Sequence, residues 1–475
     1  MTPPCPAWLV RFWCGPVTPG AASLPDPRCN GIAVEGARDR DVQGQRGSLS
    51  TCGRPMVETV TVAIVGAGQA GLSLSYELTH AAVEHVALER GSVGESWRRR
   101  WDSFRLVVPN WTVHLPGAPY DGDDPDGFMP KDEIVSYLHR YARSFSAPIR
   151  TGVEATAIEP REDGTFTLRT SNVEIRASEV VLASGGYQRA YRPAAARQMP
   201  VDSVLTIDAE GYTNPGALPE GDLLIVGSGQ TGCQLAEECF EAGRNVYLAC
   251  GRAPWVPRRI AGRDVLSWIL DTDFYEARLA DLPSPSARFV SNPQFTGHGG
   301  GRDLNYRTLQ ALGIELVGRL AGVEDGRVHF AHDLHASVAF GDARYADLRD
   351  LMAANCAARS VPAPAMPAPP AFEANPPDSL DLARVGAVIF TTGFRPDYTR
   401  WVAAFNAFDK AGFPIQVDGS STVVPGLHFM GVHFQRKRKS ATLFGVAEDA
   451  GVLAENMTSR RSPRSGPDAM TLRNR

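Results

Sequence analysis

Two stretches of the chain repeat the same order of hydrophobic and polar positions. In each stretch, a short run of β-branched and aliphatic residues leads into three closely spaced glycines. A segment with apolar residues at helical spacing follows, and a second short apolar run closes the stretch. Continuous apolar runs of this length predict buried parallel strands. The complete order predicts a strand–turn–helix–strand unit that binds a dinucleotide, and the chain carries two of them.

The first unit is expected to have strands at 60–65 and 86–89 and a helix at 72–78. Its glycines permit a tight bend, a close approach to a pyrophosphate and close packing of the helix on the strand. The carboxylate of Glu89, at the end of the second strand, can accept hydrogen bonds from ribose hydroxyls. The residues expected to bind this nucleotide are Gly66, Gly68, Gln69, Ala70, Gly71, Glu89 and Arg90.

The second unit is expected to have strands at 222–226 and 245–249 and a helix at 233–240. Its last strand leads into Cys250-Gly-Arg252, with no carboxylate to hold a ribose 2′-hydroxyl. An arginine in this position suits a 2′-phosphate and therefore favours NADPH over NADH. For each arginine here, an exposed loop residue is the alternative interpretation. The residues expected at this site are Gly227, Ser228, Gly229, Gln230, Thr231, Gly232, Arg252 and Arg258, with Arg259 as a further cation.

Other segments have simpler patterns. Apolar residues at helical spacing predict an amphipathic helix over residues 132–146. Residues 361–377 form a Pro-rich connector with little helix or strand potential, and 385–390 return to strand character. The Arg-, Ser- and Pro-rich residues 459–475 are expected to be a disordered tail.

The N-terminal residues 1–55 are rich in Pro, Gly and Arg and lack sustained periodicity. We expect a disordered extension, or an over-long gene start, because Met56 directly precedes the first strand. None of the eight cysteines forms a Cys-x-x-Cys pair, so neither a zinc ribbon nor a redox-active dithiol is indicated. This cysteine usage favours a reducing, cytoplasmic setting.

Composition adds exclusions. The chain has 475 residues, 43% of them hydrophobic, which is enough for two or three domains. A net charge of −5 gives no reason to expect a nucleic-acid partner, and no apolar run is long enough to span a bilayer. The basic run Arg436–Lys439 is four residues long and favours a solvated turn.

The most distinctive stretch is residues 94–116. It contains Gly94-Glu-Ser-Trp97-Arg-Arg-Arg100-Trp101, and Asn110 follows the next apolar run. This segment resembles the class B flavin-dependent monooxygenases, especially the plant auxin-forming and the bacterial cation-transport-associated branches. The resemblance covers residues 57–455. It includes the segments Val180–Gly185, Ile389–Pro396, Gly426–Gly431 and Leu443–Ala450.

The resemblance implies FAD at the first unit and NADPH at the second. In this family NADPH reduces FAD, O2 adds to flavin C4a, and bound NADP⁺ protects the (hydro)peroxyflavin until a substrate arrives. The resemblance places Trp97, Arg98 and Trp101 near FAD. It also places Asn110 beside the peroxyflavin as a catalytic residue. A turn residue after Pro109 is the alternative for Asn110. Further expected cofactor-binding residues are Ala155, Gly185, Gly393, Gly431, Gly445 and Val446.

The expected fold is therefore α/β, with two Rossmann-like dinucleotide-binding domains. The FAD domain is expected to combine residues 57–190 and 385–458, with the NADPH domain, 191–384, inserted between them.

The expected reaction transfers one oxygen atom from O2 to a small or medium organic substrate. An amine nitrogen or a sulfide is the favoured target, with hydroxylation or oxidative decarboxylation next. Asp208 stands where the family fingerprint has a histidine, which disfavours a Baeyer–Villiger reaction. Two alternatives remain open: an NADPH-linked flavin oxidoreductase without oxygen insertion, and a non-catalytic flavin redox sensor associated with ion transport.

Overall fold

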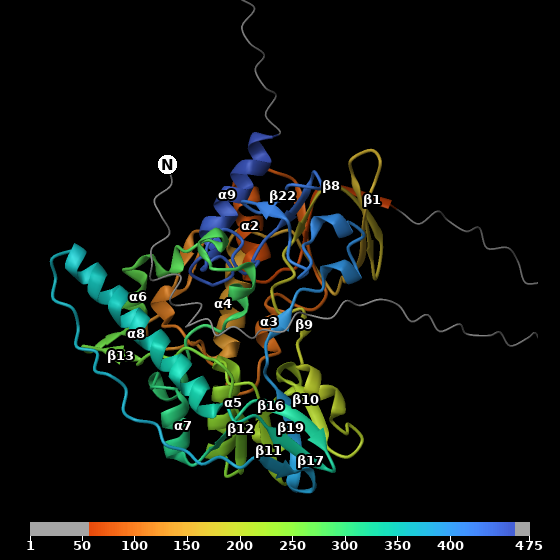
Figure 1. The fold of residues 1–475 in the computed structure, drawn as a ribbon. Coiled ribbons are helices and arrows are strands. Elements are labelled where there is room, and N and C mark those ends of the chain that lie inside the picture. The colour runs from red at the N-terminus through yellow and green to blue at the C-terminus, as the bar shows by residue number, and fades with distance from the viewer. Residues whose placement is uncertain (1–56, 461–475) are drawn as a thin grey trace, which may run out of the picture.

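The computed structural model describes residues 57–460, which fold into two lobes, each built around its own sheet (Figure 1). Most of the two termini for which disorder was expected, 1–55 and 459–475, lie outside the described residues. Ser459, the first residue expected in the C-terminal tail, is instead the last residue of helix α9 (Val446–Ser459).

The first sheet has nine strands drawn from two separate parts of the chain. At its centre β1 pairs in parallel with β2 on one side and with β8 on the other. β5 and β23 extend the parallel part, while β6 and β7 form an antiparallel hairpin that pairs with β8. The strands are β1 (Val57–Val65), β2 (His85–Glu89), β5 (Ile149–Thr151), β6 (Ala155–Pro160), β7 (Phe166–Thr170), β8 (Glu174–Leu182), β21 (Gln416–Val417), β22 (Ser420–Ser421) and β23 (Leu427–Phe429).

The second sheet has five parallel strands in the order β10-β19-β11-β12-β15. All of them lie in sequence between the two parts of the first sheet, so the second lobe is an insertion in the first. The two parallel α/β lobes confirm the expected fold class. The strands are β10 (Leu205–Asp208), β11 (Asp222–Val226), β12 (Val246–Ala249), β15 (Glu315–Val317) and β19 (Val385–Phe390).

One expected boundary is wrong. The strand at 385–390 was expected to begin the second part of the FAD domain, but β19 is the strand between β10 and β11 in the second sheet. Its run of apolar residues predicts a buried strand and carries no information on which sheet receives it. The chain returns to the first sheet only at β21.

The helices α2, α9 and α4 belong to the first lobe, and α5 follows the central strand of the second (Figure 1). The expected amphipathic helix is confirmed as α4, in which Ile134, Leu138 and Tyr141 are buried. The bounds are α2 (Gln69–His80), α3 (Glu95–Arg98), α4 (Lys131–Ser144), α5 (Gln230–Glu241), α6 (Val265–Leu270), α7 (Tyr306–Leu312) and α8 (Leu334–Ala358).

Smaller strands complete the fold. β16, β17 and β18 form a three-stranded antiparallel sheet, and the other short strands form pairs. β9 and β20 are the pair that links the two lobes, because each lies where the chain passes from one sheet to the other. The bounds are β3 (His114–Leu115), β4 (Ala118–Pro119), β9 (Arg189–Ala190), β13 (Arg259–Ile260), β14 (Arg263–Asp264), β16 (Leu320–Glu324), β17 (Arg327–Phe330), β18 (Ser379–Asp381) and β20 (Phe394–Arg395).

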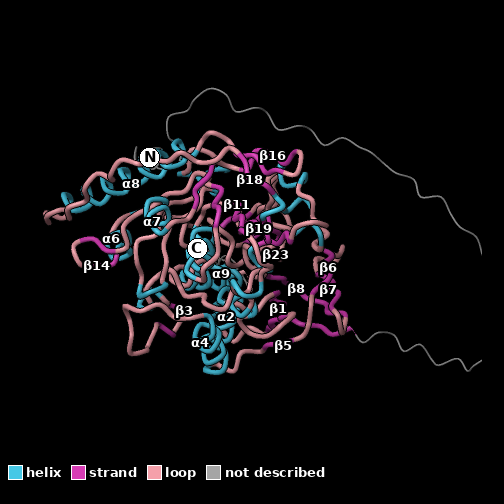
Figure 2. Tube along the Cα trace, turned by 90° about the horizontal axis from the view of Figure 1, so that it is seen from below, coloured by secondary structure: helices cyan, strands magenta, loops and turns pink. Residues whose placement is uncertain are grey.

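Two insertions surround the second sheet. Residues 250–305, here called the excursion, separate β12 from α7 and contain α6. The Pro-rich connector, 361–377, has neither helix nor strand and passes beside α7 and α8 (Figure 2). Its carbonyl groups accept hydrogen bonds from the side chains of Arg307, Gln310 and Tyr345. In the part of the chain that the structure describes, no helix is long and apolar enough to cross a membrane.

Candidate dinucleotide sites

The first Gly-rich turn joins β1 to α2 and leaves room for a ligand at one glycine only. Gly66 has a φ of +111°, and a Cβ on Gly71 would lie 1.9 Å from the Gly66 carbonyl oxygen. A Cβ on Gly68 would meet nothing within 4 Å, and Gly68 caps α2 without any side-chain hydrogen bond. Uncapped amides at the start of a helix bind anions, so this turn fits a pyrophosphate.

Glu89 ends β2 beside this turn. Its Oε2 accepts a hydrogen bond from the Ala67 amide at 2.9 Å, and its Oε1 accepts one from the Gly91 amide at 3.0 Å. The side chain is 8% exposed. Two backbone donors therefore fix a carboxylate at the edge of the turn, where its remaining lone pairs can accept hydrogen bonds from ribose hydroxyls.

The residues expected near the flavin from the 94–101 segment divide into two groups. Trp97 reaches α2, because its indole Nε1 donates a hydrogen bond to Gln69 Oε1 at 3.0 Å. Trp101 is 4% exposed and packs edge-on against Phe104, so it is a core residue in this structure. Arg98 has a 48% exposed side chain that contacts Glu95 within its own helix. The structure thus brings Trp97 to the turn through a direct contact.

The remaining residues expected at this site lie mostly in turns and at the ends of helices and strands. Gly431 follows β23 with a φ of +72°, and a Cβ there would lie 2.7 Å from the Cβ of Ala70 in the first turn of α2. Gly445 is the N-cap of α9, and Val446 is its buried first residue. Gly185 and Gly393 have positive φ and open space around them. Ala155 is half-buried on β6, and Arg90 is exposed after β2.

The second Gly-rich turn repeats this design between β11 and α5. Gly227 has a φ of +105°, and a Cβ on Gly232 would lie 1.9 Å from the Gly227 carbonyl oxygen. Gly229 caps α5 without a side-chain hydrogen bond, and Gln230 and Thr231 begin the helix half-buried. Ser228 is 3% exposed, and its Oγ accepts a hydrogen bond from the Gly251 amide at 2.8 Å. Ser228 therefore fixes the end of β12 next to the turn.

The three arginines expected near a 2′-phosphate, Arg252, Arg258 and Arg259, differ in their surroundings. Arg252 is exposed just after β12, and its guanidinium makes no hydrogen bond or ion pair with any residue of 57–460. Arg258 is 2% exposed: it pairs with Asp264 at 2.5 Å and donates to the Val107 carbonyl at 2.8 Å. The interpretation of Arg258 as a second phosphate ligand is wrong for this structure, because a buried ion pair occupies its guanidinium. The Arg252 guanidinium lies 5.9 Å from the centroid of the Phe340 ring and stays exposed, and the exposed Arg259 donates to the Gly300 carbonyl at 3.2 Å.

Asn110 begins a short 3-10 turn and is 3% exposed. Its Nδ2 donates to the Asp124 carbonyl at 2.8 Å, and its Oδ1 accepts from the Met129 amide at 2.7 Å. Both ends of the amide therefore brace the loop that returns to α4. These contacts agree with the alternative interpretation of a turn residue, and a catalytic role for Asn110 stays a prediction.

Asp208, which replaces the family's histidine, ends β10 near the links between the lobes. It forms a two-point ion pair with Arg192, with Nε–Oδ1 at 2.7 Å and Nη2–Oδ2 at 3.0 Å. The guanidinium also stacks over the ring of Phe390 in β19, 4.8 Å from its centroid. A charged pair thus fastens the linker to the second sheet at this position.

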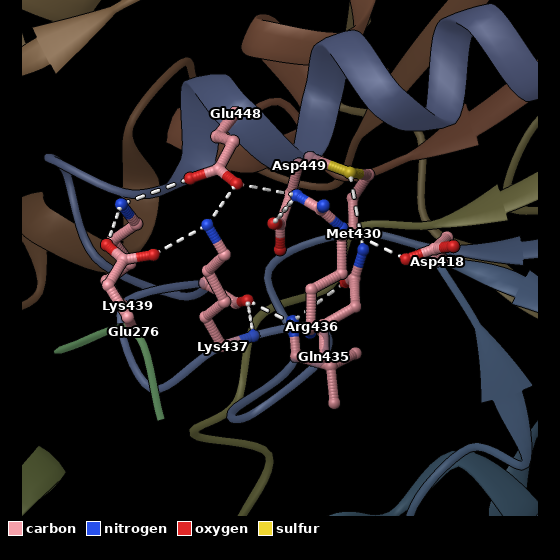
Figure 3. Close-up of polar contacts among 12 residues, drawn as sticks. Glu276, Asp418, Met430, Gln435, Arg436, Lys437, Lys439, Glu448 and Asp449 are labelled. Atoms are coloured by element: carbon pink, nitrogen blue, oxygen red, sulfur yellow. Dashed lines mark hydrogen bonds and ion pairs between the residues drawn. The ribbon is translucent and has the colours of Figure 1, made fainter. Parts of the chain in front are cut away.

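The basic run 436–439 lies at the N-terminus of α9 (Figure 3). Lys437 contacts Glu448 at 2.5 Å and Glu276 at 2.6 Å, and Lys439 contacts the same two carboxylates. Partial burial opposes the ionisation of Glu448, but hydrogen bonds from both lysines lower its pKa to about 2. Because Glu276 belongs to the excursion, this cluster joins the inserted lobe to α9. Sequence patterns alone did not pair Glu276 with this run.

Asp449 lies beside the same cluster and is 1% exposed. Its Oδ1 is 3.4 Å from Arg436 Nη1, while its Oδ2 is buried and has no hydrogen-bond partner among residues 57–460. Burial raises the pKa of Asp449 to about 6, against the smaller opposing effects of Ser440 and Arg436. The first turn of α9 therefore contains a carboxyl group with a pKa of about 6.

Three comparisons place this geometry among known proteins. The pyridine nucleotide-disulphide oxidoreductase family model matches residues 63–272, which include both Gly-rich turns. The "Uncharacterized oxidoreductase CzcO-like" of Geobacillus kaustophilus is 30% identical over 404 residues, covering 85% of this chain and 99% of its own length.

Solved structures share the fold. A flavin-containing monooxygenase from Stenotrophomonas maltophilia superimposes with a TM-score of 0.58 at 18% identity, covering 86% of this chain and all of the other. An oxidized steroid monooxygenase bound to NADP has a TM-score of 0.52 at 14% identity, covering 85% of this chain and 86% of the other. The first of these neighbours is named as a flavin-containing monooxygenase, and the second is a monooxygenase with NADP bound.

Proposed function

Because the chain belongs to the CzcO-like oxidoreductases, a flavin monooxygenase-like family, we propose that it binds FAD at the first Gly-rich turn and NADPH at the second. We propose further that it transfers one oxygen atom from O2 to a small organic substrate. An amine nitrogen or a sulfide is the favoured target, since both are soft nucleophiles, and hydroxylation is the next.

The observation that carries the proposal is the pair of matched turns with different partners. Gly68 and Gly229 both cap helices that lack a side-chain cap, so each turn offers free amides to a pyrophosphate. The first turn adds the carboxylate of Glu89, which suits ribose hydroxyls. The second adds the unpaired cation of Arg252, which suits a 2′-phosphate.

Each group then has a defined task. FAD, reduced by NADPH, supplies the activation of O2 when both are bound. The amides of α2 hold the pyrophosphate of FAD, and Trp97 fixes Gln69 at the start of that helix. The excursion packs apolar side chains, including Phe274, Phe295 and Val256, against Phe434 of the first lobe. This apolar packing joins the inserted lobe to the first lobe.

The test separates oxygen transfer from simple oxidation of NADPH. Purified enzyme is reduced either with NADPH, which leaves NADP⁺ in the sample, or with dithionite, which does not, and is then mixed with O2 in a stopped-flow spectrometer. We expect slow reoxidation through a spectroscopically distinct species that NADP⁺ prolongs. Methyl phenyl sulfide and N,N-dimethylaniline serve as probe substrates, and oxygen from ¹⁸O2 is expected in the oxidised product.

The two alternatives give different results in the same experiment. Immediate reoxidation with one hydrogen peroxide per NADPH, with or without NADP⁺, would identify an oxidoreductase without oxygen insertion. Absence of NADPH oxidation under all conditions would identify a redox sensor. Either outcome refutes the monooxygenase assignment.

A further inference from the structure

The second Gly-rich turn is covered by a short segment of the excursion, Ser291–Gln294. The Cβ of Ser291 is 3.6 Å from the position that a Cβ on Gly229 would occupy. The backbone N–H of Gln294 donates a hydrogen bond to the Pro254 carbonyl at 2.9 Å. This bond fixes the segment to the chain that leaves β12. The segment therefore forms a wall directly over the glycine at which a pyrophosphate approaches.

Two polar atoms of this wall have no partner within the described part of the chain. The Ser291 hydroxyl is buried without a hydrogen bond, and so is Oε1 of Gln294. Gln294 is 1% exposed, and its Nε2 donates to the Ser228 carbonyl at 2.8 Å and to Cys233 Sγ at 3.1 Å. Buried polar groups without partners cost free energy, so their presence at one place needs an explanation.

The unpaired atoms match the groups of a dinucleotide. A serine hydroxyl can donate a hydrogen bond to a pyrophosphate oxygen, and the negative charge strengthens that bond. A glutamine oxygen can accept a hydrogen bond from a ribose hydroxyl. The third element is α5, a helix of 12 residues whose first turn has no side-chain cap. Gly229, the N-cap of this helix, is the glycine beside Ser291.

We propose that Ser291 is a pyrophosphate ligand of the second nucleotide site. Gln294 is its positioning residue: it holds the segment on Ser228 and accepts a hydrogen bond from a ribose hydroxyl of the same ligand. The inference rests on the proposed binding of NADPH at this turn and is independent of oxygen transfer.

The experiment measures equilibrium binding to FAD-loaded enzyme, by calorimetry, for three probes: NADP⁺, NAD⁺ and 2′-AMP. The last of these has the 2′-phosphate but lacks the pyrophosphate. Ser291→Ala is expected to weaken NADP⁺ and NAD⁺ by the same factor, about tenfold, because both carry the pyrophosphate. The binding of 2′-AMP is expected to stay unchanged.

Two further variants extend the test. Ser291→Thr keeps the hydroxyl and is expected to keep NADP⁺ binding within a few-fold of wild type. Gln294→Met is expected to weaken the binding of both dinucleotides. Ser286→Ala is the matched control, because this serine of the same excursion bonds only to the Ser284 hydroxyl, at 2.9 Å.

Several results would overturn the proposal that Ser291 binds the pyrophosphate. Unchanged or tighter NADP⁺ binding by Ser291→Ala overturns the proposal, and so does an equal loss of 2′-AMP binding. A lower thermal midpoint of Ser291→Ala without ligand also overturns it, since the hydroxyl would then have a structural partner. If wild-type enzyme binds no dinucleotide, the NADPH assignment itself is wrong. Oxygen transfer is judged separately by the stopped-flow experiment.

Discussion

Two glycines of the first turn lie only three residues apart, but alanine at each should affect a different property. Alanine at Gly71 should lower stability, and alanine at Gly68 should weaken FAD binding. At Gly71 the new Cβ would lie 1.9 Å from the Gly66 carbonyl oxygen and 3.0 Å from its carbon. Both are backbone atoms, so α2 must move away from β1 to relieve the clash. Overpacking of this kind costs about 1–3 kcal/mol and occasionally more. We expect Gly71→Ala to lie at the upper end, at roughly 3 kcal/mol, because no flexible side chain can yield.

At Gly68 the same substitution meets nothing within 4 Å. Its φ of −82° and ψ of −170° are ordinary for alanine, so the stability of the apoprotein should change by about 0.5 kcal/mol or less. The methyl group would instead stand where the pyrophosphate of FAD approaches the backbone. Gly68→Ala is therefore expected to fold normally and to bind FAD at least tenfold more weakly, a loss of about 1.4 kcal/mol or more.

The assay compares thermal midpoints of the apoproteins by circular dichroism, and FAD affinity by quenching of flavin fluorescence. Gly451→Ala is the matched control, because Gly451 lies inside α9 with nothing within 4 Å of its added Cβ. It should raise stability by up to about 1 kcal/mol. Wild-type FAD affinity in Gly68→Ala would refute the pyrophosphate contact. A wild-type midpoint in Gly71→Ala would refute the helix–strand packing.

Three other predictions follow from single side chains. Arg252→Ala should raise KM for NADPH far more than KM for NADH in steady-state assays, and equal effects would remove Arg252 from the 2′-phosphate site. Burial raises the pKa of Asp449 from 3.8 to about 6. The stability of the folded protein that depends on the protonated carboxyl is therefore complete below pH 3.8 and is lost as the pH rises through 6. Asp449→Asn should therefore stabilise the protein at pH 8, by up to about 3 kcal/mol, and much less at pH 4.5; equal gains in thermal midpoint at both pH values contradict this. Asp264→Asn leaves the Arg258 guanidinium buried without its carboxylate and should cost roughly 3–5 kcal/mol; a midpoint equal to that of the exposed control Arg263→Ala would show that the pair is not needed.

The local elements were predictable because their sequences determine them. The strand over 222–226 is observed with the expected bounds, and the turns after Val65 and Val226 have the glycine conformations that the motif requires. The assignment of β19 to a sheet was not predictable, because an apolar run fits the centre of either sheet. Local pattern fixes strands and turns, whereas sheet membership depends on contacts distant in sequence.

The side chains show the same division. Arg252 was predicted from its place after a strand; it is exposed in the structure, and its part in a 2′-phosphate site stays a prediction. Arg258 looks similar in sequence, but Asp264 and the Val107 carbonyl, which lies 151 residues away, bury it in an ion pair. Ser291 and Gln294 belong to no motif, and only the folded chain shows that they lie over the second turn with unpaired polar atoms.

The excursion gives the two sites a physical connection. Its Ser291–Gln294 segment lies on the second turn, while other parts of it attach to the first lobe. Arg288 pairs with Asp409 at 3.0 Å, and Glu276 pairs with Lys437 near the start of α9. Arg258 donates to the carbonyl of Val107, three residues before Asn110. A dinucleotide that binds Ser291 therefore contacts the same element that holds the loop of Asn110 and the N-terminus of α9. These contacts tie the segment proposed to cover the second turn to the loop of Asn110 and to the N-terminus of α9.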